Sequence, residues 1–297
     1  MPAADSRANK GSTSSGPRAS GAGLRAAGGR IIGGTQDNGA LQYSFGTSWA
    51  RTAGGDGGYA AVDPQDDSTF YGEYVYASVH RTIGGAGRQY ICNGITEALK
   101  DDGQTYCGGN ATEEANFIAP FILDPNNRDR MLVGAKSLWA SNNVRLNSFS
   151  GPAWSAIKPP VSLVGQSRHY INAIAVQPGN SNVIWVGYNA SNSTSVPAQI
   201  YKTTNGLDAS PAWVLKSRSG MPNAQISRIT VDHANPDRVW VTYVGFSPNR
   251  LWETTDGGTT WRSITGNLPA VTLYDVKRHP AQPNWLYVAA ANGIYTS

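Results

Sequence analysis

Carboxylates are the side chains of this sequence that could carry acid–base chemistry, and two of them stand in unusual surroundings. Asp56 lies in the glycine-rich stretch Gly55–Tyr59, where it either faces a site or holds a turn. Glu73 is a charge inside the aromatic segment FYGEYVY, where it either lines an internal channel or points to solvent. For both residues we favour the structural interpretation, a turn aspartate and a solvent-exposed glutamate, and we assign no catalytic residue.

Histidines could bind a metal or transfer protons, but those of this chain are scattered. None of them has the spacing to another histidine or to a cysteine that metal sites show. The four residues are His80, His169, His233 and His279. We therefore predict no metal site and no cofactor.

The two cysteines, Cys92 and Cys107, lie fifteen residues apart on either side of a turn-rich stretch. A disulfide between them would fit an oxidising compartment, and two free thiols are the alternative. The spacing alone leaves both states open.

An internal repeat sets the positions of these residues. In each copy a short apolar strand ends at a marker residue, a polar turn follows, and an aromatic-rich strand begins. The markers are spaced 61, 53, 55 and 47 residues apart, and they are Pro64, Pro125, Pro178, His233 and Pro280. This period, with about four strands per copy, is typical of a propeller blade, whereas solenoid repeats are shorter. The sequence thus predicts an all-β protein, a β-propeller of four-stranded antiparallel blades.

The predicted full blades occupy residues 57–115, 116–167, 168–224 and 225–269, with an incomplete blade at each end, about six units in all. The first unit has the pattern of strands two to four of a blade, and the last has that of strands one to three. Either the two ends meet and share one blade, or the chain is part of a longer propeller. We favour the second interpretation because their combined strands overfill one blade.

Residues 251–263 read LWETTDGGTTWRS and contain a motif with the chemistry of a tight hairpin turn. The aspartate can accept hydrogen bonds from turn N–H groups, the glycine can adopt a positive φ, and the tryptophan can pack between blades. The residues that match Ser/Thr-x-Asp-x-Gly-x-Thr-Trp are Thr254, Asp256, Gly258, Thr260 and Trp261.

Two weaker copies of this motif lie at blade spacing. One runs from Thr203 to Gly206 with Trp213 after it, and the other, without the aspartate, runs from Ser44 to Trp49. With these copies the chain resembles the Asp-box propeller group over roughly residues 31–297. That group includes sialidases, xyloglucan-hydrolysing enzymes, the sortilin ectodomain and photosystem II assembly factors. The resemblance implies a propeller in which the Asp box is a structural turn away from the central site, and it does not imply catalysis.

The enzymes of that group have catalytic sites that this sequence fits only in part. The Phe-Arg-Ile-Pro stretch of sialidases is absent. Xyloglucan-hydrolysing relatives use two carboxylates, as acid and base, across the cleft between two propellers. The stretch Gly55–Tyr59 is similar to their Gly-Asp-x-Gly-Gly-aromatic segment but is one residue short, which would make Asp56 one of the pair. No second carboxylate has a matching context.

Residues 1–30 form a predicted flexible arm that is basic and rich in Gly, Ser and Ala, and residues 31–297 form the propeller. The arm holds five basic residues and one acidic residue, so all of the formal charge of +4 lies there. The remaining chain is balanced, so we predict no nucleic-acid partner. No apolar stretch is long enough to span a membrane, although the arm could touch an acidic surface.

The sequence therefore leads to two functions. The first is a non-catalytic β-propeller, periplasmic or extracellular, that binds or scaffolds a protein partner. The second is a glycoside hydrolase, similar to xyloglucanases or sialidases, or a truncated relative that binds carbohydrate. No signal peptide is visible in the sequence.

Overall fold

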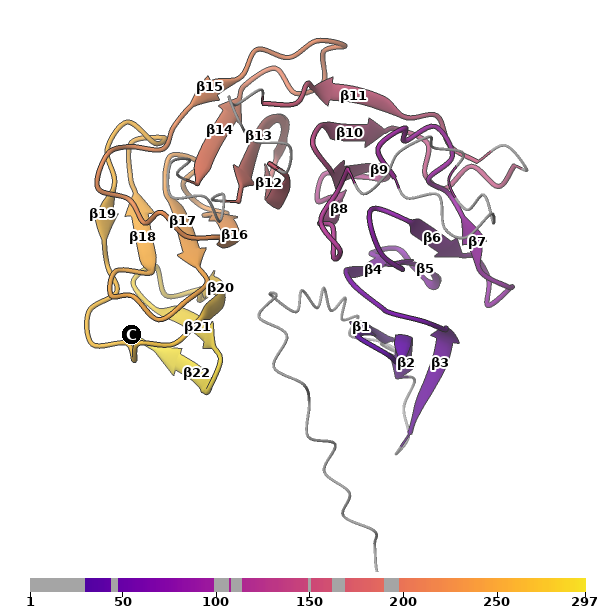
Figure 1. Ribbon diagram of the computed structural model, residues 1–297, viewed down its shortest axis with the longest axis horizontal. Helices are drawn as coiled ribbons and strands as arrows, with labels where there is room; N and C mark the ends of the chain where they lie inside the picture. The colour runs from indigo at the N-terminus through magenta and orange to yellow at the C-terminus, as the bar shows by residue number, and fades with distance from the viewer. Residues whose placement is uncertain are drawn as a thin grey trace, which may run out of the picture.

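The computed structural model describes residues 30–43, 48–98, 107, 114–148, 151–161, 169–189 and 198–297. These residues contain no helix and form six antiparallel sheets that follow one another along an arc (Figure 1). No helix of the described chain is therefore long and apolar enough to cross a membrane. The predicted all-β propeller with about six units is confirmed. The predicted arm up to residue 29 and Ser44 of one weak motif copy lie outside the described residues.

Each sheet is one blade, and we number the blades in chain order. The two end blades have three strands. Blade 1 contains β1 (Ile31–Thr35), β2 (Gly39–Tyr43) and β3 (Trp49–Ala53). Blade 6 contains β20 (Leu273–Arg278), β21 (Leu286–Ala290) and β22 (Gly293–Thr296).

The four blades between them have four strands each, in simple up-and-down order. Blade 2 contains β4 (Ala60–Asp63), β5 (Asp66–Glu73), β6 (Val79–Thr82) and β7 (Gln89–Tyr90). Blade 3 contains β8 (Phe121–Asp124), β9 (Asn127–Gly134), β10 (Leu138–Ser141) and β11 (Ser155–Lys158). Blade 4 contains β12 (Ile171–Gln177), β13 (Asn180–Tyr188), β14 (Gln199–Thr203) and β15 (Val214–Leu215). Blade 5 contains β16 (Ile226–Val231), β17 (Val239–Tyr243), β18 (Leu251–Thr254) and β19 (Arg262–Ser263).

The arc is open between its two ends. Blades 1 and 6 are separate sheets, and they stand at opposite ends of the row of blades (Figure 1). Among the described residues, each hydrophobic cluster joins two consecutive blades, and none joins blade 6 to blade 1. The interpretation in which the chain ends share one blade is therefore wrong for this structure.

The residue before each repeat marker holds the turn between the first and second strands of its blade, and we call it the turn residue. In blades 2, 3 and 5 its carboxylate accepts a hydrogen bond at 2.9 Å from the backbone N–H two residues later. The turn residues are Asp63, Asp124, Gln177, Asp232 and His279. They also tie blades together, because Arg128 of blade 3 donates to Asp63 and Arg278 of blade 6 donates to Asp232. In blades 2 to 6, equivalent positions of the paired strands can be found by counting from the turn residue of each blade.

Candidate functional site at the centre of the arc

The residue four positions before each turn residue lies in the innermost strand of its blade or directly before it. In three blades this residue is polar: Tyr59 in blade 2, Arg228 in blade 5 and Asp275 in blade 6. In β16 and β20 the strand pairing shifts by one residue directly before Arg228 and Asp275. Such a bulge bends the strand and re-aims a side chain. The repeat therefore brings three chemically different side chains to one place.

Tyr59 is the residue that connects these side chains. Its hydroxyl donates to the carbonyl oxygen of Asn172 in blade 4 at 3.4 Å. The Arg228 guanidinium carbon lies 5.8 Å from the centroid of the Tyr59 ring, and Arg228 Nε lies 3.5 Å from Asp275 Oδ2. We call Tyr59, Asn172, Arg228 and Asp275 the central site. Residues of four blades meet there, Asn172 through its backbone carbonyl.

The charges of the central site support one another. Burial raises the pKa of the Tyr59 hydroxyl, and the nearby Arg228 opposes that rise. Burial lowers the pKa of Arg228, but Tyr59 and Asp275 outweigh it, so the net shift is upward and Arg228 stays charged. Asp275 also lies 3.3 Å from Lys277 Nζ and accepts a bond from the Val276 N–H at 2.8 Å. The site thus combines one carboxylate with two cations.

Amide side chains complete one wall of the central site. Asn116 Nδ2 donates to Asn172 Oδ1 at 2.6 Å and to the Ile171 carbonyl at 2.9 Å. These bonds fix the orientation of the Asn172 amide, since its oxygen is the acceptor. Its Nδ2 is buried and has no partner among the described residues.

Glu73 does not lie in solvent, so that prediction from the sequence is wrong. Its carboxylate is buried and accepts hydrogen bonds from the backbone N–H groups of Ala119, Ala77 and Tyr59 at 2.7, 3.3 and 3.4 Å. Gly58 makes room for it, because a Cβ there would lie 2.1 Å from Glu73 Oε2. Burial raises the pKa of Glu73 well above its usual range, and the three N–H groups oppose this. The residue is a clamp between blades 2 and 3 and has no oxygen free for a substrate.

Asp56 holds a turn, in the way that we favoured. Its Oδ1 accepts a hydrogen bond from the Asp37 N–H at 2.9 Å, and Asp37 has a φ of 66° at the tip of the β1–β2 hairpin. The bond joins the glycine-rich stretch to blade 1. Asp56 and Glu73 therefore have different structural tasks, and each carboxylate accepts hydrogen bonds from backbone N–H groups.

The Asp-box residues form a closed turn between β18 and β19. Asp256 Oδ1 accepts hydrogen bonds from the Thr254 hydroxyl and the N–H groups of Thr259 and Thr260, at 2.8, 2.9 and 2.9 Å. Gly258 has a φ of 84°, and its N–H donates to the Thr254 hydroxyl. The Trp261 indole donates to the Lys216 carbonyl of blade 4 at 2.9 Å. The turn lies at the outer strands, away from the central site.

Two other blades have the same turn with asparagine in place of aspartate. In blade 4 the Thr203 hydroxyl donates to Asn205 Oδ1, and the Trp213 indole donates to the Ile157 carbonyl of blade 3. In blade 3 the corresponding residues are Ser141, Asn143 and Trp154, and the Trp154 indole donates to the Ile91 carbonyl of blade 2. The sequence analysis missed the copy in blade 3. Each tryptophan therefore fastens its own blade to the end of the preceding one.

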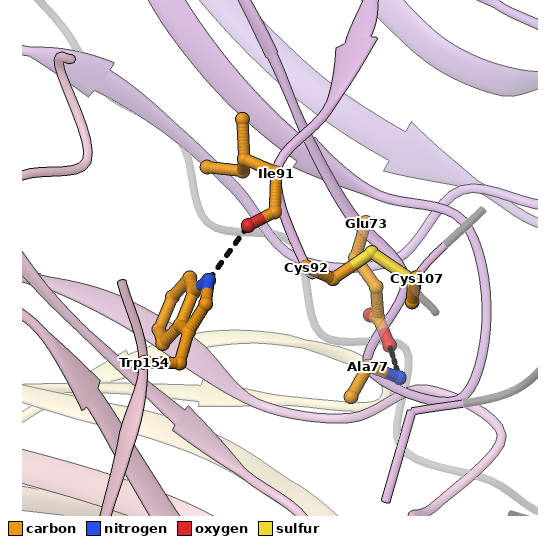
Figure 2. The surroundings of a disulfide bond; sticks show 6 residues. All are labelled: Glu73, Ala77, Ile91, Cys92, Cys107 and Trp154. Atoms are coloured by element: carbon orange, nitrogen blue, oxygen red, sulfur yellow. Dashed lines mark hydrogen bonds between the residues drawn. A yellow bond between two sulfur atoms is a disulfide. The ribbon is translucent and has the colours of Figure 1, made fainter. Parts of the chain in front are cut away.

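Cys92 and Cys107 are joined in a disulfide. Figure 2 shows this bond with Glu73 and Trp154 around it. Both cysteines belong to the hydrophobic cluster between blades 2 and 3, and Trp154 packs against the same cluster. The two states that the spacing left open are thereby resolved in favour of the disulfide in this structure. No three His, Cys, Asp or Glu side chains of the described chain lie together as a metal site would require.

The face of blade 6 that looks away from blade 5 carries exposed apolar side chains. Tyr287 is 37% exposed and Ile294 is 75% exposed. Strand pairing, counted from the turn residues, gives the equivalent pair in every full blade. These pairs are Tyr71 and Val79, Leu132 and Leu138, Trp185 and Ile200, and Trp240 and Leu251, and all of them are buried. Each buried pair packs in a hydrophobic cluster with the next blade. The outer face of blade 6 is thus built like an inter-blade contact, and no blade of the described residues packs on it.

Blade 1, at the other end of the arc, has one face that packs on blade 2 and one face that is more exposed. Ile32 points toward blade 2 and packs on Ala60 and Phe70. The alternate residues Ile31 and Leu41 are half-buried, and Trp49 at the outer strand is exposed. We call this surface and the outer face of blade 6 the end faces.

The sequence matches no protein-family model and no curated protein. Its fold is that of solved β-propellers. It is similar to the GH74 xyloglucanase from Xanthomonas campestris, with a TM-score of 0.61, 16% identity, and coverage of 91% of this chain and 43% of that chain. It is also similar to YCF48 from Cyanidioschyzon merolae, with a TM-score of 0.57, 15% identity, and coverage of 93% and 80%. The Cps50 (Swd1) propeller domain of Myceliophteria thermophila gives a TM-score of 0.61, 11% identity, and coverage of 93% and 82%.

These likenesses establish the fold and leave function open. The chain spans less than half the length of the xyloglucanase chain. Enzymes and non-enzymes occur among the similar propellers, and a shared fold carries no activity at such identities. Likewise, none of the comparisons tests the Asp-box group specifically. The central site was missed by sequence reasoning because each blade carries a different residue there; counting four positions back from each turn residue would have found it.

Proposed function

We propose that this protein is a non-catalytic β-propeller that acts as a binding or scaffolding subunit of a protein complex. The observation that carries this proposal is the pair of end faces. Tyr287 and Ile294 are exposed where the equivalent residues of four blades are buried between sheets. Exposed apolar surface at a position that is otherwise an interface marks a protein interaction site. The similarity of the fold to YCF48, one structure of which is described as bound to a D1 peptide, agrees with protein binding.

The chemistry of the central site also supports a non-catalytic role. A glycosidase needs two carboxylates that reach the substrate, one to donate a proton and one to act as base or nucleophile. Here Glu73 is enclosed by three backbone N–H groups, and Asp56 holds a hairpin. Asp275 and Glu73 both act on Tyr59, but Asp275 is paired with Arg228 and Lys277 while Glu73 is held by backbone donors. Recognition is the task that this chemistry fits.

The test is partner recovery with variants at an end face. The tagged full chain would capture partners from its source, and Ile294→Asp is the variant. Phe246→Asp is the control, because Phe246 is 77% exposed and lies between β17 and β18 of blade 5. We expect a specific partner with the wild type and with Phe246→Asp, and its loss with Ile294→Asp at unchanged melting temperature. A partner that Ile294→Asp still recovers in full would contradict the proposal. Light scattering of the purified chain identifies a second copy as the partner.

We further propose that the protein works in an oxidising compartment, the periplasm or the cell exterior. The disulfide between Cys92 and Cys107 supports this, because such bonds persist mainly outside the reducing cytosol. Alkylation of freshly isolated protein is the test: no cysteine should react before reduction. Full labelling of both thiols in the native material would overturn the assignment.

A glycoside hydrolase is the second candidate. The similarity of the fold to the GH74 xyloglucanase favours it, together with the partly exposed carboxylate of Asp275 at the centre of the arc. Release of reducing ends from xyloglucan that Asp275→Asn abolishes would replace the first proposal with this one. No release at high protein concentration would dismiss it.

A further inference from the structure

The Arg228 guanidinium is mostly enclosed, with 18% of its side chain exposed, yet it makes no hydrogen bond to a described residue. Its Nε is buried without a partner, and the nearest carboxylate oxygen, Asp275 Oδ2, lies 3.5 Å away and is not aligned for a bond. Arginine has five N–H donors and no acceptor. A buried donor without an aligned acceptor is costly, so an acceptor placed beside Arg228 would stabilise the site.

Asn172 supplies an independent observation in the same site. Its Nδ2 is buried and has no partner in the described chain, while its Oδ1 is taken by Asn116. The free group is therefore a donor. Tyr59 touches both residues, since its hydroxyl reaches the Asn172 carbonyl and its ring lies under Arg228.

The charges of the site define the kind of ligand. Arg228 and Lys277 face one carboxylate, that of Asp275, which is also satisfied by the Val276 N–H. Glu73, the other carboxylate that acts on Tyr59, is enclosed by three backbone N–H groups. The remaining charges have a positive surplus, and the unused groups of Arg228 and Asn172 are donors. A planar or tetrahedral oxyanion offers several acceptors and a negative charge, which is the complement of such a set.

We propose that the central site binds an oxyanion, a carboxylate or phosphate group, with Arg228 as its cation and the Asn172 amide as a further donor. The ligand would lie at the centre of the arc, where blades 2, 4, 5 and 6 meet. Its cation Arg228 lies in blade 5, whereas Asp275 pairs with Ala289 on the outer face of blade 6. Substitutions at Arg228 and at Ile294 therefore test the ligand and the protein partner separately.

The test is thermal unfolding of the full chain in sodium phosphate, sodium malonate and sodium chloride at equal ionic strength. A bound ligand stabilises the folded state by mass action, so at ten times its Kd the melting temperature should rise by about 2–4 °C. Phosphate also stabilises folded proteins in general. The measured quantity is therefore the shift in melting temperature of the wild type minus that of Arg228→Gln. The variant should lose the part of the shift that comes from binding at the central site.

Further variants sharpen the result. Arg51→Gln, at an exposed arginine of β3, should keep the full shift. Asp275→Asn should enlarge it, because a competing carboxylate is removed. A larger shift in malonate assigns a carboxylate ligand, and a larger shift in phosphate assigns a phosphoryl ligand. Equal shifts for the wild type and Arg228→Gln in both salts would overturn the proposal.

Discussion

The turn in blade 5 and the turn in blade 3 have almost the same geometry and quite different sequences. In blade 5, Thr254 and Asp256 form the turn; in blade 3, Ser141 and Asn143 do, with hydroxyl-to-oxygen distances of 2.8 and 3.0 Å. The difference is in the second oxygen. Asp256 Oδ2 accepts the Thr260 hydroxyl at 2.6 Å and the Thr260 N–H at 3.1 Å, and an asparagine has no second acceptor to offer. One acceptor is thus enough to shape the turn, and the second one closes it more tightly.

The largest effect should come from the tryptophans, which both kinds of turn share. Trp261→Ala removes a side chain that packs on Trp185 and donates to Lys216 of the preceding blade. We expect a loss of about 3 kcal/mol in the free energy of unfolding, the low end of the range for tryptophan truncation because Trp261 is half-buried. Urea unfolding measures it. Trp154→Ala in blade 3 should cost a similar amount; a negligible cost there would break the equivalence of the two turns.

Substitutions at Asp256 separate the two oxygens. Asp256→Ala should lower the melting temperature less than Trp261→Ala does, and Asp256→Asn less again, because asparagine keeps one acceptor for the turn. Differential scanning calorimetry of the three variants gives the order. If Asp256→Asn were as harmful as Asp256→Ala, the charge and not the acceptor would shape the turn.

The pH dependence of the blade 5 turn follows from the same bonds. The Thr260 hydroxyl and N–H hold the pKa of Asp256 well below its usual 3.8. As the pH falls, the Asp256 carboxylate binds a proton in the unfolded chain before it does so in the folded protein. The stabilisation by these bonds is therefore present above pH 3.8 and is lost as the pH falls through the lower pKa of the folded protein. The stability of the wild type relative to Asp256→Asn should therefore shrink between pH 5 and pH 2, values that bracket the usual carboxyl range. A constant difference would mean that the hydrogen bonds do not favour the charged form.

The turn in blade 4 differs from both by a buried lysine near its tryptophan. Lys158 Nζ lies 4.3, 4.9 and 5.8 Å from the ring centroids of Tyr201, Tyr188 and Trp213. Burial lowers the pKa of Lys158 from 10.5 to about 8. The folded protein therefore releases this proton before the unfolded chain does, so stability should rise with pH between about 8 and 10.5. Chemical denaturation of the wild type against Lys158→Met measures this rise, and the tyrosines common to both proteins cancel. A difference that falls with pH would contradict the burial.

The smallest effects test whether the asparagine turns can be improved. Asn143→Asp in blade 3 should stabilise by about 0.5 kcal/mol, since a charged acceptor forms stronger bonds with Ser141 and the Ala153 N–H. Asn205→Asp in blade 4 should not, because the Asn205 amide donates to Asp208 at 2.8 Å and a carboxylate there would repel it. Equilibrium unfolding of both variants should show this opposite response.

The sequence allowed the blades to be predicted because turns and markers recur at a regular spacing. It did not reveal the turn of blade 3, where Trp154 follows Asn143 at a longer distance than Trp261 follows Asp256. The insertion hides the motif from a pattern of fixed length, although the hydrogen bonds survive. The overall fold is thus easier to predict from the sequence than the equivalence of individual turns.

The candidate site was harder to predict for a different physical reason. Glu73 was expected in solvent because a charge in an aromatic strand has no local partner. Its three partners are backbone N–H groups, one of them 46 residues away at Ala119. Almost every residue has a backbone N–H group, so the residue types do not show which of these groups will be a partner. Arg228 and Asp275 are remote from Tyr59 along the chain, and they share with it only their position four residues before a turn residue. The arrangement of the blades along the arc brings them together.

The position four residues before each turn residue has a consequence for how such a molecule can change over generations. Five blades place one side chain each there, and in this chain they are Tyr59, Pro120, Ala173, Arg228 and Asp275. Tyr59 and Ala173 also belong to the hydrophobic clusters that stack the blades, whereas Arg228 and Asp275 do not. A single codon change at Arg228 or Asp275 can therefore alter the charge at the centre without removing a side chain from those clusters. In this architecture, selectivity for a ligand at the centre can change in evolution by substitutions in one blade at a time.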